Sequence, residues 1–311
     1  MDALYDVVIV ILSIVALWKG ADLVVDSAVL LGRQFGMSDL IIGLTIVAFG
    51  TSAPEFAVTI SAALNGQADI SVGNVVGSNI FNLGFILGGV AAFRAIPVSK
   101  SLVQRDGTIL IAITIVLFIF IYDLTLSRFE GVMLFSGLLV YLGYLLIKGE
   151  DIEEEKVVEK EATLLEWVTL IAGLELVVGG GHFLVESASS LARTAGISEW
   201  VIAVTIVAAG TSAPEMATSL MAILRGRYGI SVGNLIGSDI FNLLGVLGVA
   251  GMLNPHMTVD SSALWSVGAL IGMVCLVVYF LYTGLRLERW EGGVLIAIGV
   301  IRWILDFMWQ S

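Results

Sequence analysis

The sequence predicts an all-α integral membrane protein in which two repeats of five transmembrane helices lie in opposite orientations. Composition, ten long apolar runs and a duplicated block of sequence lead to this prediction. Apolar residues make up 58% of the chain, charged residues only 14%, and the mean hydropathy is +1.00. Because a soluble domain carries about 25% charged residues, we expect most of this chain's surface to face lipid. Soluble repeat proteins are thereby excluded, and the single cysteine, Cys275, excludes a disulfide scaffold.

Ten apolar runs are each long enough to span a bilayer, which takes about 20 mainly apolar residues. The first run lacks the cationic segment and the small-residue cleavage site of a signal peptide, so we expect it to be retained as a membrane helix. Polar residues separate the runs, which cover residues 4-31, 38-64, 69-92, 104-122, 130-148, 163-192, 198-224, 229-253, 260-282 and 290-309.

Lysine and arginine residues fall mainly on one side of the predicted membrane. With the N-terminus outside, eleven of them lie in the inner segments and three in the outer ones. Because these residues concentrate on the cytoplasmic side of membrane proteins, we expect a multi-pass cell-membrane protein with both termini outside.

The second half of the chain repeats the first at an offset of 160 residues. Between residues 41-90 and 201-250, 28 of 50 positions are identical. The chain is therefore divided into a first repeat, residues 1-148, a linker, residues 149-162, and a second repeat, residues 163-311. Five helices per repeat force the second repeat to insert upside down. Such inverted repeats are typical of secondary transporters with a site near the membrane midplane, although a pseudo-symmetric channel remains open.

The linker is strongly acidic, with seven carboxylates against two lysines between Gly149 and Glu161. It is predicted to lie in the cytoplasm. We interpret it as a solvated hinge, with regulation through Ca²⁺ or a partner as the alternative. Nothing in the charge pattern indicates a nucleic-acid surface.

Each repeat contains the hexapeptide Gly-Thr-Ser-Ala-Pro-Glu, at Gly50 to Glu55 and again at Gly210 to Glu215. Proline has no N–H to donate and glycine is a weak helix residue, so the helix is expected to break there. A broken helix at membrane depth is tolerated only where it lines a cavity or is buried in protein. The break should free backbone carbonyls, which we expect at Ala48, Thr51, Ala208 and Thr211.

Oxygen ligands for a hard cation gather around these breaks. Glu55 and Glu215 are carboxylates inside the membrane, which are functional by default. On the helix that follows, Ser78 and Asn82 are four residues apart on one face, and so are Ser238 and Asn242. Together with Ser52 and Ser212, this set suits Ca²⁺ and Na⁺. Without a Cys/His cluster, neither a soft metal, a resident cofactor nor an enzyme activity is expected; His182 and His256 are interpreted as interfacial, with pH sensing as the alternative.

With these motifs in place, the sequence resembles the cation/Ca²⁺ exchanger superfamily, and within it the prokaryotic sodium/calcium exchangers. The likeness covers nearly the whole chain and is carried by two copies of G-T-S-A-P-E, each followed by G-S-x-I-F-N. It implies four adjacent cation positions at the midplane, and sliding of the first and sixth helices to alternate access. The implied ligands are Glu55, Glu215 and the Thr51 and Thr211 carbonyls for Ca²⁺; Ala48, Ser52 and Ser238 with Glu215 for one Na⁺; Ala208, Ser212 and Ser78 with Glu55 for another; and Asn82 and Asn242 at the centre.

Three positions depart from particular branches of the family. Asn242 stands where K⁺-dependent relatives carry Asp, which argues against K⁺ co-transport, and Asp239 replaces the asparagine of the first repeat. The H⁺-coupled branch usually has G-N-x-x-E where this chain has G-T-S-A-P-E. The resemblance therefore implies Na⁺/Ca²⁺ antiport by a monomer in the lipid bilayer, with three Na⁺ per Ca²⁺. Ca²⁺/H⁺ antiport through the same glutamates is the first alternative, ahead of a cation channel or a membrane scaffold.

Overall fold

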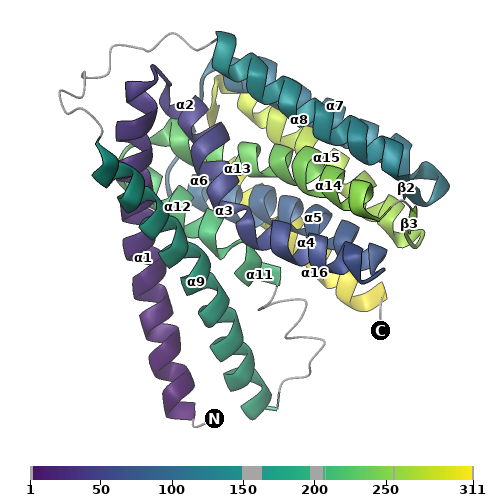
Figure 1. Cartoon of the computed structure of the whole chain (residues 1–311), viewed down its shortest axis with the longest axis horizontal. Coiled ribbons are helices and arrows are strands. Elements are labelled where there is room, and N and C mark those ends of the chain that lie inside the picture. Colours follow the sequence, from purple (N-terminus) through teal and green to yellow (C-terminus); the bar gives the residue numbers. More distant parts are fainter. Residues whose placement is uncertain (1–2, 149–162, 197–205, 207, 255, 310–311) are drawn as a thin grey trace.

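In a computed structural model, the chain forms a bundle of long helices with four short strands at their connections (Figure 1). The structure describes residues 3–148, 163–196, 206, 208–254 and 256–309. Two expected segments lie at least partly outside these residues. They are the linker, residues 149-162, and the first part of the helix expected at 198-224. Within them the chain is helical almost throughout, so the all-α prediction is confirmed.

The first half runs from α1 to α8. Its elements are α1 (Ala3–Gln34), α2 (Asp39–Ile42), η1 (Gly43–Val47), α3 (Ala48–Thr51), α4 (Ala53–Leu64), α5 (Ala68–Phe81), η2 (Asn82–Leu87), α6 (Gly88–Phe93), β1 (Ile96–Pro97), η3 (Leu102–Gly107), α7 (Thr108–Phe120), η4 (Ile121–Asp123), β2 (Thr125–Ser127) and α8 (Arg128–Lys148). Segments that follow one another without a gap, such as α5, η2 and α6, form one long helix.

The second half repeats this order. Its elements are α9 (Leu164–Thr194), α11 (Ala208–Thr211), α12 (Ala213–Leu224), α13 (Tyr228–Ile240), η6 (Phe241–Val246), α14 (Leu247–Leu253), β3 (His256–Thr258), α15 (Ser262–Gly284), β4 (Arg286–Leu287) and α16 (Arg289–Trp309). Wherever both ends of an expected helix are described, they fall within three residues of the observed ends.

Seven helices in the described part of the chain are long and apolar enough to cross a membrane, and a bent pair gives an eighth span. The two other expected spans are residues 198-224, only partly described, and the helix Arg289–Trp309, which has the expected length. The structure therefore shows a multi-span membrane protein, while the count of ten stays a prediction.

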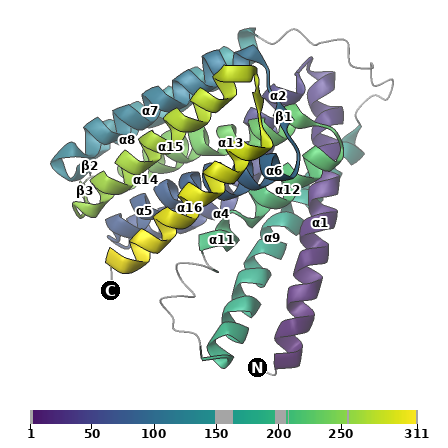
Figure 2. The ribbon, with the colours of Figure 1, turned by 180° about the vertical axis from the view of Figure 1, so that it is seen from behind.

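Two small antiparallel sheets tie the halves together at opposite ends of the bundle (Figure 2). Strand β1 pairs with β4, and β2 pairs with β3, so each sheet takes one strand from each half. The offset of 160 residues converts β1 into β3 and β2 into β4, so it exchanges the two sheets. This exchange is what a two-fold relation between inverted repeats requires, and it places the connections at residues 94–101 and 285–288 together, as the predicted topology does.

Helices α1 and α9 form a separate antiparallel pair beside the rest of the bundle (Figures 1 and 2). Their buried side chains belong to a hydrophobic cluster distinct from the main core. The two backbones approach closely at Gly20 and Gly173: a Cβ atom on Gly173 would lie 3.0 Å from the Gly20 carbonyl oxygen. Small residues allow such close packing of membrane helices.

Both hexapeptides break their helices, as predicted. Ser52 has φ −76° and ψ 7° between α3 and α4, and Ser212 has φ −90° and ψ 11° between α11 and α12. Each new helix has its proline in the first turn, where the missing N–H costs no hydrogen bond. The helix axis bends by 50° between Asp39–Thr51 and Ala53–Leu64. In each hexapeptide one helix therefore ends and another starts at the serine, which places the glutamate in the first turn of the new helix.

The close approach of α1 and α9 predicts that Gly173→Leu destabilises the protein. A side chain there must displace Gly20 and Val24 of α1, and overpacking of this kind costs about 1–3 kcal/mol. Gly179→Leu is the matched control on the same helix, because a Cβ atom at Gly179 meets nothing within 4 Å. Thermal unfolding in detergent should show a lower midpoint for Gly173→Leu only. Equal midpoints for the two variants would contradict the close packing described here.

Candidate functional site

The two hexapeptides meet in the interior, each serine reaching the glutamate of the opposite half. Glu55 and Glu215 are both fully buried. Ser52 Oγ donates to Glu215 Oε1 at 3.3 Å, and Ser212 Oγ donates to Glu55 Oε1 at 3.2 Å. The offset of 160 residues converts one of these hydrogen bonds into the other, so the two glutamates form a symmetric centre.

The helices that follow complete the arrangement. Ser238 Oγ also donates to Glu215 Oε1, at 3.4 Å, and Ser78 is the buried serine that corresponds to Ser238 in the first half. The hydrogen bonds therefore place Ser52 and Ser238 with Glu215 and Ser212 with Glu55, and the offset of 160 residues assigns Ser78 to the Glu55 group. The family resemblance implies the same grouping for two cation positions, although a hydrogen bond between two side chains is not itself evidence of ion binding.

Several buried oxygens in this region have no hydrogen-bond partner. They are Glu55 Oε2, Glu215 Oε2, Asn82 Oδ1, Asn242 Oδ1 and Asp239 Oδ2. An unsatisfied buried polar atom costs about 1–3 kcal/mol, and more when it is charged. All five are acceptors, and no Lys, Arg or His among the described residues forms an ion pair with either glutamate. A cation would satisfy such a set of oxygens.

The backbone around the breaks only partly matches the prediction. The sequence predicted a free carbonyl at Ala48. In the structure the Ala48 carbonyl oxygen accepts hydrogen bonds from the Ser52 N–H at 3.1 Å and from the Thr51 hydroxyl at 3.4 Å, so this part of the prediction is wrong. The reason is that the helix ends after this hydrogen bond rather than before it. Pro54 has no N–H and therefore cannot donate the helical hydrogen bond to the Gly50 carbonyl, four residues earlier. Sequence reasoning overlooked this carbonyl.

The equivalent carbonyls of the second repeat lie on one short helix. Ala208 begins α11 and Thr211 ends it, one residue before the break at Ser212. Thr211 is half-buried, whereas Thr51 is fully buried. The two halves are thus not identical at the threonine that each hexapeptide contributes.

Two asparagines that sequence reasoning missed hold the glutamate-bearing helices in place. Asn74 Nδ2 donates to Thr59 Oγ1 at 3.0 Å and to the Glu55 carbonyl at 3.4 Å. Asn234 Nδ2 donates to Ser219 Oγ and to the Glu215 carbonyl at the same distances. A signal was available, because both belong to the repeated S-V-G-N motif and precede the predicted serines by one helical turn.

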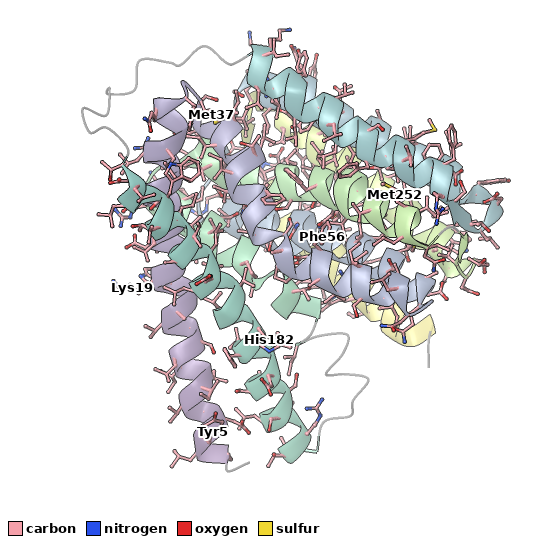
Figure 3. All side chains as sticks on the ribbon, viewed as in Figure 1. Tyr5, Lys19, Met37, Phe56, His182 and Met252 are labelled. Carbon is pink, nitrogen blue, oxygen red and sulfur yellow. The ribbon has the colours of Figure 1, made fainter. Side chains whose placement is uncertain are left out.

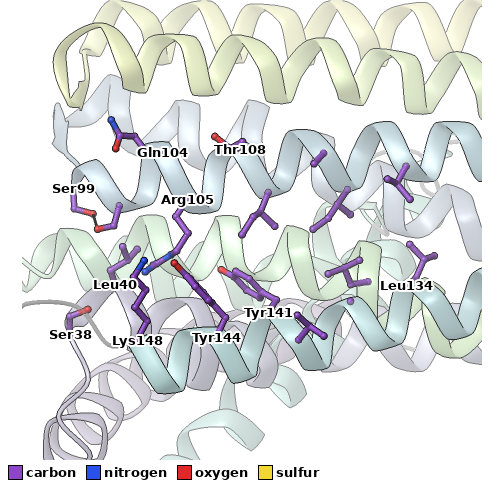
Figure 4. A pocket seen from close by; sticks show the side chains of 18 of the residues that line it. Ser38, Leu40, Ser99, Gln104, Arg105, Thr108, Leu134, Tyr141, Tyr144 and Lys148 are labelled. Atoms are coloured by element: carbon purple, nitrogen blue, oxygen red, sulfur yellow. Dashed lines mark hydrogen bonds between the residues drawn. The ribbon is translucent and has the colours of Figure 1, made fainter.

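Other polar features lie apart from this centre. A cavity of about 1330 Å³ opens between α7 and α8, and its lining includes Arg105, Tyr141, Tyr144 and Lys148 but neither glutamate (Figure 4). His182 is an exposed residue of α9, close to Glu186 on the same helix (Figure 3). None of these residues contributes to the set of buried oxygens.

The composition of the centre limits the cations that it can hold. Among the residues that the structure describes, no group of three or more His, Cys, Asp or Glu side chains could hold a metal ion. Two carboxylates with hydroxyl, amide and carbonyl oxygens suit Na⁺ or Ca²⁺, which accept neutral oxygen ligands in flexible geometries.

Comparison with known proteins places this site in a family. The family described as "Sodium/calcium exchanger protein" matches residues 5–147 and 165–301, one match within each half of the chain. The chain is 32% identical to sodium/calcium exchanger MaX1 of Methanosarcina acetivorans, over 92% of this chain and 94% of the relative. It is 31% identical to inner membrane protein YrbG of Escherichia coli, over 97% of both.

A solved structure of the sodium-calcium exchanger NCX_Mj, soaked with zero Na⁺ and Ca²⁺, has the same fold. Its TM-score with this chain is 0.85 at 31% sequence identity, and the match covers 96% of this chain and 98% of that one. The chain therefore belongs to the sodium/calcium exchanger family, whose members are membrane ion transporters rather than enzymes.

Proposed function

We propose that this protein is a secondary antiporter that exchanges Na⁺ for Ca²⁺ by alternating access, with both ions bound between Glu55 and Glu215. The observation that carries the proposal is the pair of buried glutamates, each with one oxygen held by serine and the other without a partner. The names of MaX1 and NCX_Mj, both sodium/calcium exchangers, support the choice of ions.

The ligands proposed for each ion follow the hydrogen-bonded groups. Both glutamates share Ca²⁺, because each presents an oxygen without a partner. The flanking Na⁺ positions lie where serines from the two halves converge on one glutamate. The proposed ligands are Glu55, Glu215 and the Thr51 and Thr211 carbonyls for Ca²⁺; Ala48, Ser52, Ser238 and Glu215 for one Na⁺; Ala208, Ser212, Ser78 and Glu55 for the other; and Asn82 and Asn242 between them.

Charge explains why ion binding would be coupled to transport. Two ionised glutamates carry a charge of −2, which one Ca²⁺ or two Na⁺ balance. Without a cation, two like charges remain in an enclosure of low dielectric constant, where each costs several kcal/mol even after relaxation. The empty site is therefore reluctant to close and change sides, whereas the loaded site is not. This difference produces exchange rather than leak.

The part that moves during transport is proposed to be the pair of helices α1 and α9. Helices α1 and α9 pack closely on each other, and their hydrophobic cluster, separate from the main core, meets the other helices mainly at α12 and at the α2–η1 segment. Sliding of this pair over the other spans would expose Glu55 and Glu215 to one side at a time. In this proposal the chain has ten spans, both termini lie outside, and the acidic linker is a cytoplasmic hinge between the halves.

Ca²⁺/H⁺ antiport is the second candidate function. It is favoured by the oxygens without partners on Glu55 and Glu215, since a carboxyl group that lacks a cation can hold a proton there. Proteoliposomes distinguish the two candidates. Under Na⁺/Ca²⁺ antiport, an imposed Na⁺ gradient drives Ca²⁺ uptake at constant pH. Uptake driven by a pH gradient, without any response to Na⁺, would establish the second candidate instead.

The central glutamates predict a large and specific effect of charge removal. Glu55→Gln and Glu215→Gln should each reduce Ca²⁺ uptake by more than about tenfold, because an amide supplies only one neutral oxygen where the carboxylate had two charged ones. Glu288→Gln is the control, since Glu288 is a half-buried residue at the end of the bundle whose carboxylate pairs with Arg286, away from the two glutamates. Initial rates of ⁴⁵Ca²⁺ uptake would measure this; wild-type rates in both site variants would contradict the proposed site.

The ligand set also predicts discrimination against Mg²⁺. Mg²⁺ requires a compact octahedron and gives up its water reluctantly, whereas Ca²⁺ accepts 6–8 oxygens at variable distances. Millimolar Mg²⁺ should therefore inhibit Ca²⁺ uptake far less than the same concentration of Sr²⁺ or unlabelled Ca²⁺. If Mg²⁺ competed as strongly as Ca²⁺, the site would have to be smaller and more rigid than proposed.

A further inference from the structure

Two asparagine side chains at the centre of the site present free oxygens, and both are held from the other half of the protein. Asn82 begins η2 and Asn242 lies in η6, and each is buried. Asn82 Nδ2 donates to Asp239 Oδ1 at 3.0 Å, and Asn242 Nδ2 donates to Asn79 Oδ1 at 3.0 Å. The amide oxygens of Asn82 and Asn242 have no partner.

Asp239 determines which way the Asn82 amide points. A carboxylate oxygen only accepts hydrogen bonds, so the atom of Asn82 that faces it must be the nitrogen. Turning the amide over would place two acceptor oxygens 3.0 Å apart inside the protein. The Asn82 oxygen therefore points away from Asp239. Asn82 lies one helical turn after Ser78, so it shares the helix face of that candidate ligand.

The same residue fixes the second amide through its backbone. Asn79 Nδ2 donates to the Asp239 carbonyl oxygen at 3.1 Å, and a carbonyl also only accepts. Asn79 must therefore turn its own oxygen toward Asn242, and Asn242 Nδ2 donates to this oxygen at 3.0 Å. The Asn242 oxygen is left free, one turn after Ser238 and its bond to Glu215.

We propose that Asp239, together with Asn79, is a positioning residue that locks the amides of Asn82 and Asn242 with their oxygens toward the transported cation. The two pairs are related by the offset of 160 residues, but the aspartate in the second repeat makes them chemically unequal. The Asn82 amide is held directly by the Asp239 side chain, whereas the Asn242 amide is held by Asn79, whose own orientation is set by the Asp239 backbone carbonyl. The Asp239 side chain thus removes the alternative orientation of the Asn82 amide, and its backbone carbonyl, acting through Asn79, removes that of the Asn242 amide.

This inference rests on the proposed cation transport, and a double-mutant cycle tests it. Asp239→Leu keeps the approximate side-chain size but removes the acceptor, and should raise the Ca²⁺ concentration for half-maximal uptake by about 10- to 100-fold, the usual effect of losing a group that orients a metal ligand. Asp239→Asn retains an acceptor oxygen and should restore most of the affinity. Both effects should appear in the half-saturating concentration more than in the maximal rate.

The decisive comparison is the double variant Asp239→Leu/Asn82→Ala. Because Asp239 acts through Asn82, its loss should add nothing once Asn82 is removed. Additive effects would overturn the proposal, either through direct ligation of the cation by Asp239 or through a purely structural role. The cycle of Asn79→Leu with Asn242→Ala tests the other half of the site in the same way, and remains available if Asp239→Leu fails to fold.

Controls separate the failure of this inference from the failure of the proposed function. Thr114→Val removes a buried hydroxyl that bonds only to the Leu110 carbonyl of its own helix, and should leave the Ca²⁺ affinity unchanged. The rise in unfolding temperature with added Ca²⁺ or Na⁺ reports binding without transport. If the wild type bound these ions but did not transport Ca²⁺, the antiport proposal would be wrong. The positioning role could then still be tested by the same double-mutant cycles, with the ion-induced rise in unfolding temperature as the measured quantity.

Discussion

The burial of two carboxylates with no cationic side chain of the described residues beside them is the constraint on which the rest of this structure depends. Glu55 and Glu215 are shielded from solvent, and each uses one oxygen to accept hydrogen bonds from serines. Such hydrogen bonds lower the free energy of an ionised carboxylate but do not neutralise it. The arrangement makes physical sense when a mobile cation supplies the missing charge, which a resident lysine or arginine would block.

Duplication and helix breaking build this arrangement from ordinary residues. Pro54 and Pro214 restart a helix in the middle of the protein, so a glutamate falls in the first turn of each new helix. Inversion of the second repeat then brings the two breaks together, and Ser52 and Ser212 cross from one half to the other. Neither half alone can form these two crossing hydrogen bonds, so the centre requires both hexapeptides.

Much of this organisation could be predicted from the sequence, because it follows from the long apolar runs, the prolines and the repeat at an offset of 160 residues. Apolar length gave the helices to within three residues, and proline gave the breaks. Contacts between the repeats were harder to predict: the pairing of Asn82 with Asp239 needs the relative depth of two helices 157 residues apart, and no local pattern records it. The prediction for the Ala48 carbonyl was wrong because a proline removes only the N–H that would donate to one carbonyl, that of Gly50. The other carbonyls of the turn keep their donors, as the bond from the Ser52 N–H to Ala48 shows.

The position of a bound ion is the most direct test of the account. Strontium has the charge and ligand preferences of calcium and scatters X-rays anomalously. Crystals of this protein soaked in Sr²⁺ should give an anomalous peak between Glu55 Oε2 and Glu215 Oε2, the two carboxylate oxygens that lack a partner. Peaks only at the protein surface, with the two glutamates hydrogen-bonded to each other, would contradict the claim that these carboxylates are held ready for a transported cation.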